Sequence, residues 1–202
     1  MSNFRRRLMM SFEKKYTPVK YLESTGTQYI DTNYKPNGNT IIELKYQTPT
    51  QNTIQQGIFG ARDSGNNRFT LFTGAVKNGF QVDYSIVEPG LAIYSQNIPG
   101  VDGTAINVIK LSNYLIINDN KISEVSKKTF QNSQNMYLFA NNNNGIAQLP
   151  MKGYIWYFKI YEGDTLVRDY IPVIDSSGRP CLYDKVEDKF YYNQGTGEFL
   201  YK

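Results

Sequence analysis

The chain has 202 residues, of which 40% are hydrophobic and 14% aromatic, and this length can hold one all-β domain with a sizeable core. The net charge is +4, and much of the basic excess lies in residues 5–7 and 14–15, so a general nucleic-acid-binding face is not indicated. The absence of histidine excludes Ser-His-Asp and Cys-His catalysis and histidine-ligated zinc, and the single cysteine excludes an intrachain disulfide.

Residues 1–15 form a basic, mildly apolar arm ahead of the predicted domain. The apolar run after the three arginines ends at Ser11, short of the roughly 7–15 residues of a signal-peptide core. No stretch is long enough to span a membrane, so we expect a protein that folds in a cytoplasm. Apolar residues at every fourth position indicate an anchoring arm, either helical or extended, and a frayed terminus is the alternative. The predicted anchoring residues are Phe4, Arg5, Arg6, Arg7, Leu8 and Phe12.

The first half of the domain carries strand patterns separated by turns. Residues 40–47 alternate, with Ile42, Leu44 and Tyr46 on the face that we expect to be buried. Further strands are predicted at residues 57–62, 68–72 and 80–84, with a loop at 63–67 and a hairpin turn at Asn78-Gly79.

The second half continues this pattern. Residues 104–112 alternate through Ile106 and Val108, which we expect on the buried face, and strands at 114–117 and 121–125 flank a tight turn at 118–120. An apolar strand is predicted at 136–140. Residues 153–161 form the strongest strand, in which Trp156 alternates with Phe158 and is expected in the core, and residues 165–173 form its hairpin partner. No window has a helical period with caps, so the sequence predicts an antiparallel sandwich or barrel without specifying the strand order.

Acidic residues offer the one remaining enzymatic route, because a glycosidase needs two carboxylates about 5–10 Å apart. Glu162 and Asp164 lie on a turn, with no further Glu at the spacing that a glucanase strand requires, and Glu43 has Lys45 two residues later. We therefore predict no catalytic residue and no enzyme. The loops at 63–67 and 118–120 carry oxygen ligands suited to Ca²⁺, but Asn is explained first by its tolerance of turn geometry, so no metal or other cofactor is predicted and Ca²⁺ is a minor alternative.

Sugar binding requires aromatic rings beside amide or carboxylate groups. The best local match is the polar run that follows the apolar strand at 136–140, and a plain polar loop is the alternative. The predicted glycan-contacting residues are Tyr137, Asn141, Asn142, Asn143 and Asn144.

Two long motifs resemble a known family. Residues 21–32 (YLESTGTQYIDT) resemble the opening of concanavalin A-like (laminin G-like) jelly-roll domains in phage and prophage structural proteins and in surface proteins of gut bacteria. Residues 157–173, continuing through 181–185, 189–191 and 193–199, resemble the closing part of the same domains. The first ten residues resemble the starts of short proteins in phages of gut Bacteroidales and in their hosts.

The resemblance implies that residues 16–202 form one jelly-roll sandwich behind the arm of residues 1–15. It implies a virion structural protein (capsid decoration, head fibre or tail component) that is assembled in the host cytoplasm and resides in the virion. The implied partners are other virion proteins, further copies of the chain and bacterial surface glycans, with no membrane and no specific nucleic acid. The alternatives are a carbohydrate-binding module of a bacterial surface protein and, with least support, a glycoside hydrolase.

Overall fold

The computed structural model describes residues 15–49, 55–73, 80–86, 93–95, 104–124 and 129–202. All regular elements within these ranges are β-strands, and none of these ranges contains a helix that could cross a membrane. Outside these ranges lie the turn predicted at residues 78–79 and the predicted anchoring residues, which are Phe4, Arg5, Arg6, Arg7, Leu8 and Phe12.

The strands are β1 (Tyr16–Pro18), β2 (Leu22–Thr25), β3 (Ile30–Asp31), β4 (Thr40–Gln47), β5 (Gln56–Arg62), β6 (Asn67–Thr73), β7 (Phe80–Ile86), β8 (Ile93–Ser95), β9 (Asn107–Leu111), β10 (Tyr114–Ile117), β11 (Asn120–Glu124), β12 (Tyr137–Leu138), β13 (Asn141–Asn143), β14 (Ile146–Gln148), β15 (Lys152–Glu162), β16 (Thr165–Asp175), β17 (Pro180–Asp184), β18 (Lys189–Tyr191) and β19 (Leu200–Tyr201).

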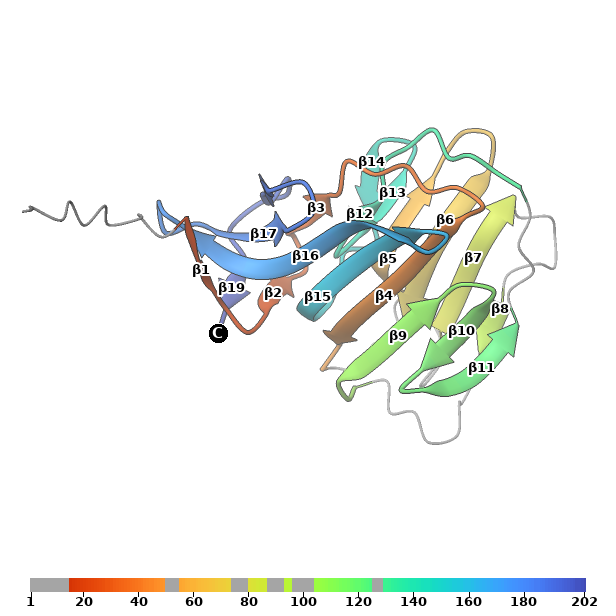
Figure 1. Cartoon of the computed structure of the whole chain (residues 1–202), viewed down its shortest axis with the longest axis horizontal. Helices are drawn as coiled ribbons and strands as arrows, with labels where there is room; N and C mark the ends of the chain where they lie inside the picture. The colour runs from red at the N-terminus through yellow and green to blue at the C-terminus, as the bar shows by residue number, and fades with distance from the viewer. Residues whose placement is uncertain (1–14, 50–54, 74–79, 87–92, 96–103, 125–128) are drawn as a thin grey trace, which may run out of the picture.

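These strands form two sheets stacked in two layers (Figure 1). The eleven-stranded sheet runs β11-β10-β9-β4-β15-β16-β17-β18, with β1 paired to β16 and with β2 between β15 and β19. The eight-stranded sheet runs β14-β13-β5-β6-β7-β8, with β12 joining β3 to β5. Nearly all pairings are antiparallel, and β13 with β5 is the parallel one among the described strands. The predicted all-β, two-sheet fold is therefore confirmed.

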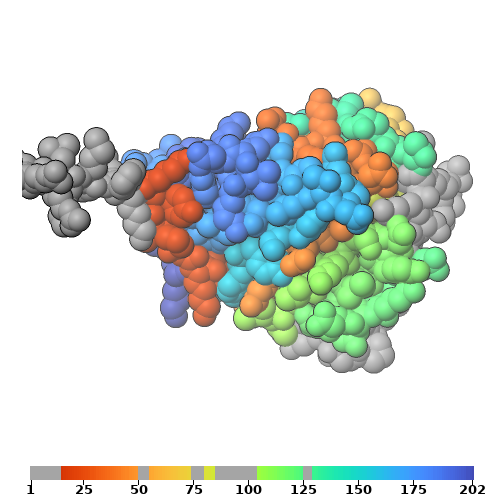
Figure 2. Space-filling model, viewed as in Figure 1, coloured from red at the N-terminus to blue at the C-terminus, as the bar shows by residue number. Residues whose placement is uncertain are grey.

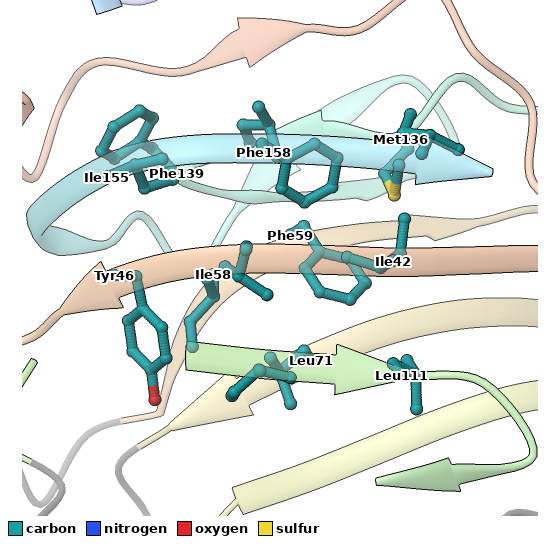
Figure 3. Packing of buried hydrophobic residues seen from close by; sticks show 14 of the residues in the cluster. Ile42, Tyr46, Ile58, Phe59, Leu71, Leu111, Met136, Phe139, Ile155 and Phe158 are labelled. Atoms are coloured by element: carbon teal, nitrogen blue, oxygen red, sulfur yellow. The ribbon is translucent and has the colours of Figure 1, made fainter. Parts of the chain in front are cut away.

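The core lies between the two sheets. In the eight-stranded sheet, one inward row crosses five neighbouring strands, and every member is at most 1% exposed: Ile30, Leu138, Phe59, Leu71 and Val82. The facing sheet contributes inward residues of β4 and β15, and Figure 3 shows Ile42 and Phe158 among the side chains that meet those of β5. Each fully buried side chain of this size contributes about 1.5–3 kcal/mol to folding.

The prediction for β4 is confirmed, but the one for β9 has the wrong face. Antiparallel register places Ile109 opposite Leu44 and Leu111 opposite Ile42, so the odd-numbered residues of β9 face the core. Ile106 is 46% exposed and Val108 is half-buried. Both faces of this segment carry branched apolar residues, so alternation within the segment was ambiguous and the partner strand decides between them.

Trp156 also lies outside the predicted core. On β4, Tyr46 pairs with Ile155 and Lys45 pairs with Tyr157, so Trp156 is the extra residue of a β-bulge. The bulge shifts the alternation by one position, which leaves Ile155 and Phe158 inside and turns the half-buried Trp156 outward. A period-2 pattern read across the bulge therefore placed Trp156 on the wrong side.

A smaller hydrophobic cluster covers the outer side of the eleven-stranded sheet, at the end where β1 pairs with β16. Its buried members are Val173, Cys181 and Tyr183, and partly buried rings pack around them. Burial raises the pKa of Cys181 to about 12, so this thiol is a small core residue and not a nucleophile. Lys15 closes the cluster with an ion pair to Asp188 (Nζ–Oδ1 2.5 Å).

Candidate functional site

A second row of residues crosses the eight-stranded sheet on the side away from the core. The strand register shows which residues belong to this second row, because residues directly opposite one another on paired strands lie on the same face. Each member is adjacent in its own strand to a member of the inward row, so it points away from the core. We call this outward surface the polar face; its row consists of Asp31, Tyr137, Gly60, Thr70 and Asp83, and Tyr29, Arg68, Gln81 and Asn141 lie beside it.

Asn141 lies directly over Gly60. A Cβ on Gly60 would overlap Asn141 Oδ1 and come within 2.9 Å of Thr70 Cγ2, so only glycine allows this approach. Asn141 is 5% exposed, and its Oδ1 has no hydrogen-bond partner. A buried amide oxygen without a partner costs free energy in the folded state.

Asp83 holds the other end of the row. Its carboxylate accepts hydrogen bonds from Thr70 Oγ1 (3.2 Å) and Gln81 Nε2 (3.2 Å), and Arg68 Nη1 lies 3.7 Å from Oδ2. The Asp83 side chain is 2% exposed and that of Arg68 21% exposed. The pair therefore fixes a partly accessible guanidinium, a planar group that can bind two oxygens at once, at the edge of the polar face.

Aromatic rings stand at the opposite end. The rings of Tyr29 and Tyr137 lie 4.8 Å apart at 31°, and Asn135 Nδ2 donates to Asp31 Oδ2 (3.2 Å) beside them. Burial raises the pKa of Tyr137, and Asp31 and Tyr29 add to the shift, so its hydroxyl stays protonated at neutral pH. The polar face thus combines rings with planar amide and carboxylate groups.

The polar run predicted as a loop is mostly strand. Asn141–Asn143 forms β13, which pairs with β5 and β14. Asn142 is 1% exposed and fully engaged: its Nδ2 donates to Asn135 O (2.7 Å), and its Oδ1 accepts from Gly145 N (2.7 Å). Asn143 bonds Gln148, and Asn144, with φ +53°, ends the strand.

The structure thus brings two of the five predicted residues, Tyr137 and Asn141, next to Gly60, on the edge of β5 that faces away from β6. Sequence reasoning missed Asp31, Arg68, Thr70 and Asp83. Their common signal is an outward position on adjacent strands, which becomes visible only once the strand pairing is known.

The acidic residues considered for other chemistry lie elsewhere. Burial alone would raise the pKa of Asp63, but hydrogen bonds from Asn67 and Ser133 outweigh it and lower that pKa, so the turn itself uses the carboxylate. Glu162 accepts hydrogen bonds from Tyr34 and Asn37. Among the residues that the structure describes, no three acidic, Cys or His side chains group together to hold a metal ion. The Ca²⁺ alternative stays a prediction.

The sequence matches no protein-family model and no curated protein. The fold is similar to that of the CBM40 module of the Ruminococcus gnavus IT-sialidase bound to α2,3-sialyllactose, with a TM-score of 0.51 and 18% identity over 74% of this chain and 90% of the module. The structure of this module with α2,6-sialyllactose gives a TM-score of 0.51 and 17% identity over the same shares. At this identity the likeness establishes the jelly-roll fold.

Proposed function

We propose that this chain is a carbohydrate-binding module whose glycan site is the polar face. The observation that carries the proposal is the single outward row in which a tyrosine pair, an unpaired amide oxygen and an arginine–carboxylate pair follow one another across five strands. Sugars offer vicinal hydroxyls to planar polar side chains and apolar ring faces to aromatic side chains, so this sequence of groups matches their chemistry.

Two of these groups are suited to direct contact. Arg68 and Tyr29 are partly exposed at the two ends of the row, whereas Thr70 and Asp83 are buried and orient their neighbours. The similarly folded CBM40 module was solved with sialyllactose, which makes this sugar the first probe to use, with lactose as the neutral comparison.

Isothermal titration calorimetry of the full chain with sialyllactose and lactose tests the proposal. We expect Arg68→Gln and Tyr29→Ala each to weaken binding at least tenfold. Arg68→Gln should also lower the thermal stability, because it leaves the buried Asp83 carboxylate without its cation, so binding is measured at a temperature where circular dichroism shows each variant to be folded. Arg179→Gln is the matched control, because Arg179 lies on an exposed turn over the ring of Tyr192, far from the polar face in the fold. Binding that persists in both polar-face variants would place the site elsewhere, and absence of binding across a broad glycan array would refute the function.

The role as a virion structural protein stays a second proposal. It is supported by the resemblance of the framing motifs and by the basic arm of residues 1–15, with Lys15 fixed at the domain surface by Asp188. Under it, the domain is displayed on a particle and its polar face contacts host-surface glycans. Deletion of residues 2–14 should abolish incorporation into particles while leaving glycan binding intact, so the two proposals can fail separately.

A further inference from the structure

The outer side of the eleven-stranded sheet carries a cluster of three rings. Tyr21 lies 4.9 Å from Tyr154 and 5.3 Å from Trp156, and the last two rings are 6.0 Å apart. The bulge in β15 is what turns Trp156 into this cluster, and bulges commonly re-aim a side chain where a surface is used. In Figure 2 the strands β9, β4 and β15 lie side by side at the molecular surface.

Beside the rings, the outward residues of β4 and β15 form three cross-strand pairs. We call these pairs, together with the three rings, the aromatic face. Strand register gives the pairs as Glu43 with Lys159, Lys45 with Tyr157, and Gln47 with Tyr154. Each pair is complementary: the first joins opposite charges, the second a cation and a ring, and the third an amide and a phenol.

The surface next to this face is apolar. Ile106 precedes Asn107, which pairs with Tyr46, so antiparallel register places Ile106 opposite Gln47, and it is 46% exposed. At the other side Leu200 pairs with Glu23, which in turn pairs with Tyr154, and Leu200 is 52% exposed. Exposed aliphatic residues next to aromatic rings are typical of protein–protein contacts.

We propose that the aromatic face binds a second copy of the chain around a two-fold axis that runs between β4 and β15, parallel to the strands. Such an axis places β4 of one copy over β15 of the other. Every pair that is complementary within the sheet is then repeated across the interface, so Glu43 faces the other copy's Lys159 and Lys45 faces its Tyr157. Ile106, Gln47, Tyr154 and Glu23 lie in one register row, so the same axis places Ile106 of β9 over the other copy's Glu23. The eleven-stranded sheets of the two copies then pack face to face about 10 Å apart, as the sheets of a β-sandwich do.

This dimer leaves the polar face free, because the polar face lies on the other sheet and points the opposite way. The inference is therefore independent of the proposed glycan site. If both hold, the dimer presents two glycan sites on opposite sides, which suits a cross-linking or multivalent binder.

Sedimentation velocity of the full chain over a micromolar concentration series tests the association. We expect a monomer–dimer equilibrium, and Ile106→Glu should shift it to monomer, because it places a like charge opposite the other copy's Glu23. Val186→Glu is the matched control, since Val186 is 47% exposed but lies at the turn between β17 and β18, away from the aromatic face. A single monomeric species at all concentrations overturns the proposal, as does a trimer or larger closed ring.

A charge swap tests the register. Glu43→Lys and Lys159→Glu should each weaken the dimer at least tenfold, because each places like charges across the axis, and the double variant should restore it. Both single variants also place like charges side by side within one sheet, so thermal unfolding is followed in parallel to confirm that the variants fold. A dimer that Ile106→Glu, Glu43→Lys and Lys159→Glu all leave intact would place the interface elsewhere and contradict the proposal.

Discussion

The two outward faces of this sandwich are built from the same kind of strand but differ in what they expose. On the polar face, Thr70 and Asp83 are almost completely buried and satisfy one another, and the unpaired group is one amide oxygen over Gly60. On the aromatic face, rings and charged side chains remain half-buried, and the bulge at Trp156 turns an extra ring outward. The first arrangement suits a small polar ligand and the second a broad partner, which is why we assign them different functions.

The largest expected effect on stability comes from Phe158 on β15, and Trp156, two residues earlier but on the opposite face because of the bulge, gives the comparison. Phe158→Ala removes a fully buried ring from the core and should cost about 3–5 kcal/mol, whereas Trp156→Ala on the aromatic face should cost about 1–2 kcal/mol, because Trp156 is half-buried. Urea unfolding of both variants gives the two free energies. Equal losses would mean that Trp156 points into the core after all and that the bulge is wrongly placed.

A smaller effect distinguishes the polar face from ordinary strand surface. Gly60→Ala should destabilise by about 1–3 kcal/mol, since the added Cβ overlaps Asn141 Oδ1 and crowds Thr70. Asn141→Ala removes the overlapping atom, so the double variant should recover part of the loss, and the coupling energy is measured with a double-mutant cycle. Gly163, on the turn at residues 163–164, has open space around its Cβ position and a φ of +56°. Asn tolerates this backbone conformation better than other residues, so Gly163→Asn is the control that adds a Cβ at an exposed glycine. Simple additivity in the cycle would contradict the contact between Asn141 and Gly60.

The two faces also differ in how far the sequence could predict them. Alternation in residues 40–47 predicted β4 correctly, because one face is apolar and the other polar and only one register buries the apolar set. It failed at β9, where both faces carry apolar residues, and at Trp156, where a bulge breaks the period. Local composition singled out Tyr137 and Asn141, whose contact with a glycan stays a prediction. Asp31 and Asp83 lie more than fifty residues from both in the sequence, so only the strand pairing places them in the same row.

Acid should loosen the turn at residues 175–179, which joins β16 to β17. Hydrogen bonds from the Ser177 hydroxyl, from Arg179 N and from the Tyr192 hydroxyl, opposed by burial, lower the pKa of Asp175 to about 2 from its ordinary 3.8. A carboxyl whose pKa is lower in the folded state contributes stability above its unfolded pKa and loses it as the pH falls through the folded value. The melting temperature should therefore fall between about pH 4 and pH 2.

Asp175→Asn should make this fall shallower, and differential scanning fluorimetry across the pH range measures it. Asp164→Asn, on the exposed turn between β15 and β16, is the control and should leave the slope unchanged. An identical slope in Asp175→Asn and the native chain would show that other carboxylates govern acid unfolding.

The smallest effect leaves stability untouched and separates the two faces with one probe. Trp156 is the only tryptophan, and Lys45 Nζ lies 5.8 Å from its ring centroid on the aromatic face. Because dimerisation covers this face, raising the protein concentration should shift Trp156 emission to shorter wavelength and protect it from acrylamide quenching, whereas saturating sialyllactose at fixed concentration should change neither. Ile106→Glu should abolish the concentration dependence and Arg68→Gln should leave it intact. A glycan-induced shift that survives Arg68→Gln would mean that the sugar binds over the rings, and the assignment of the two faces would then have to be exchanged.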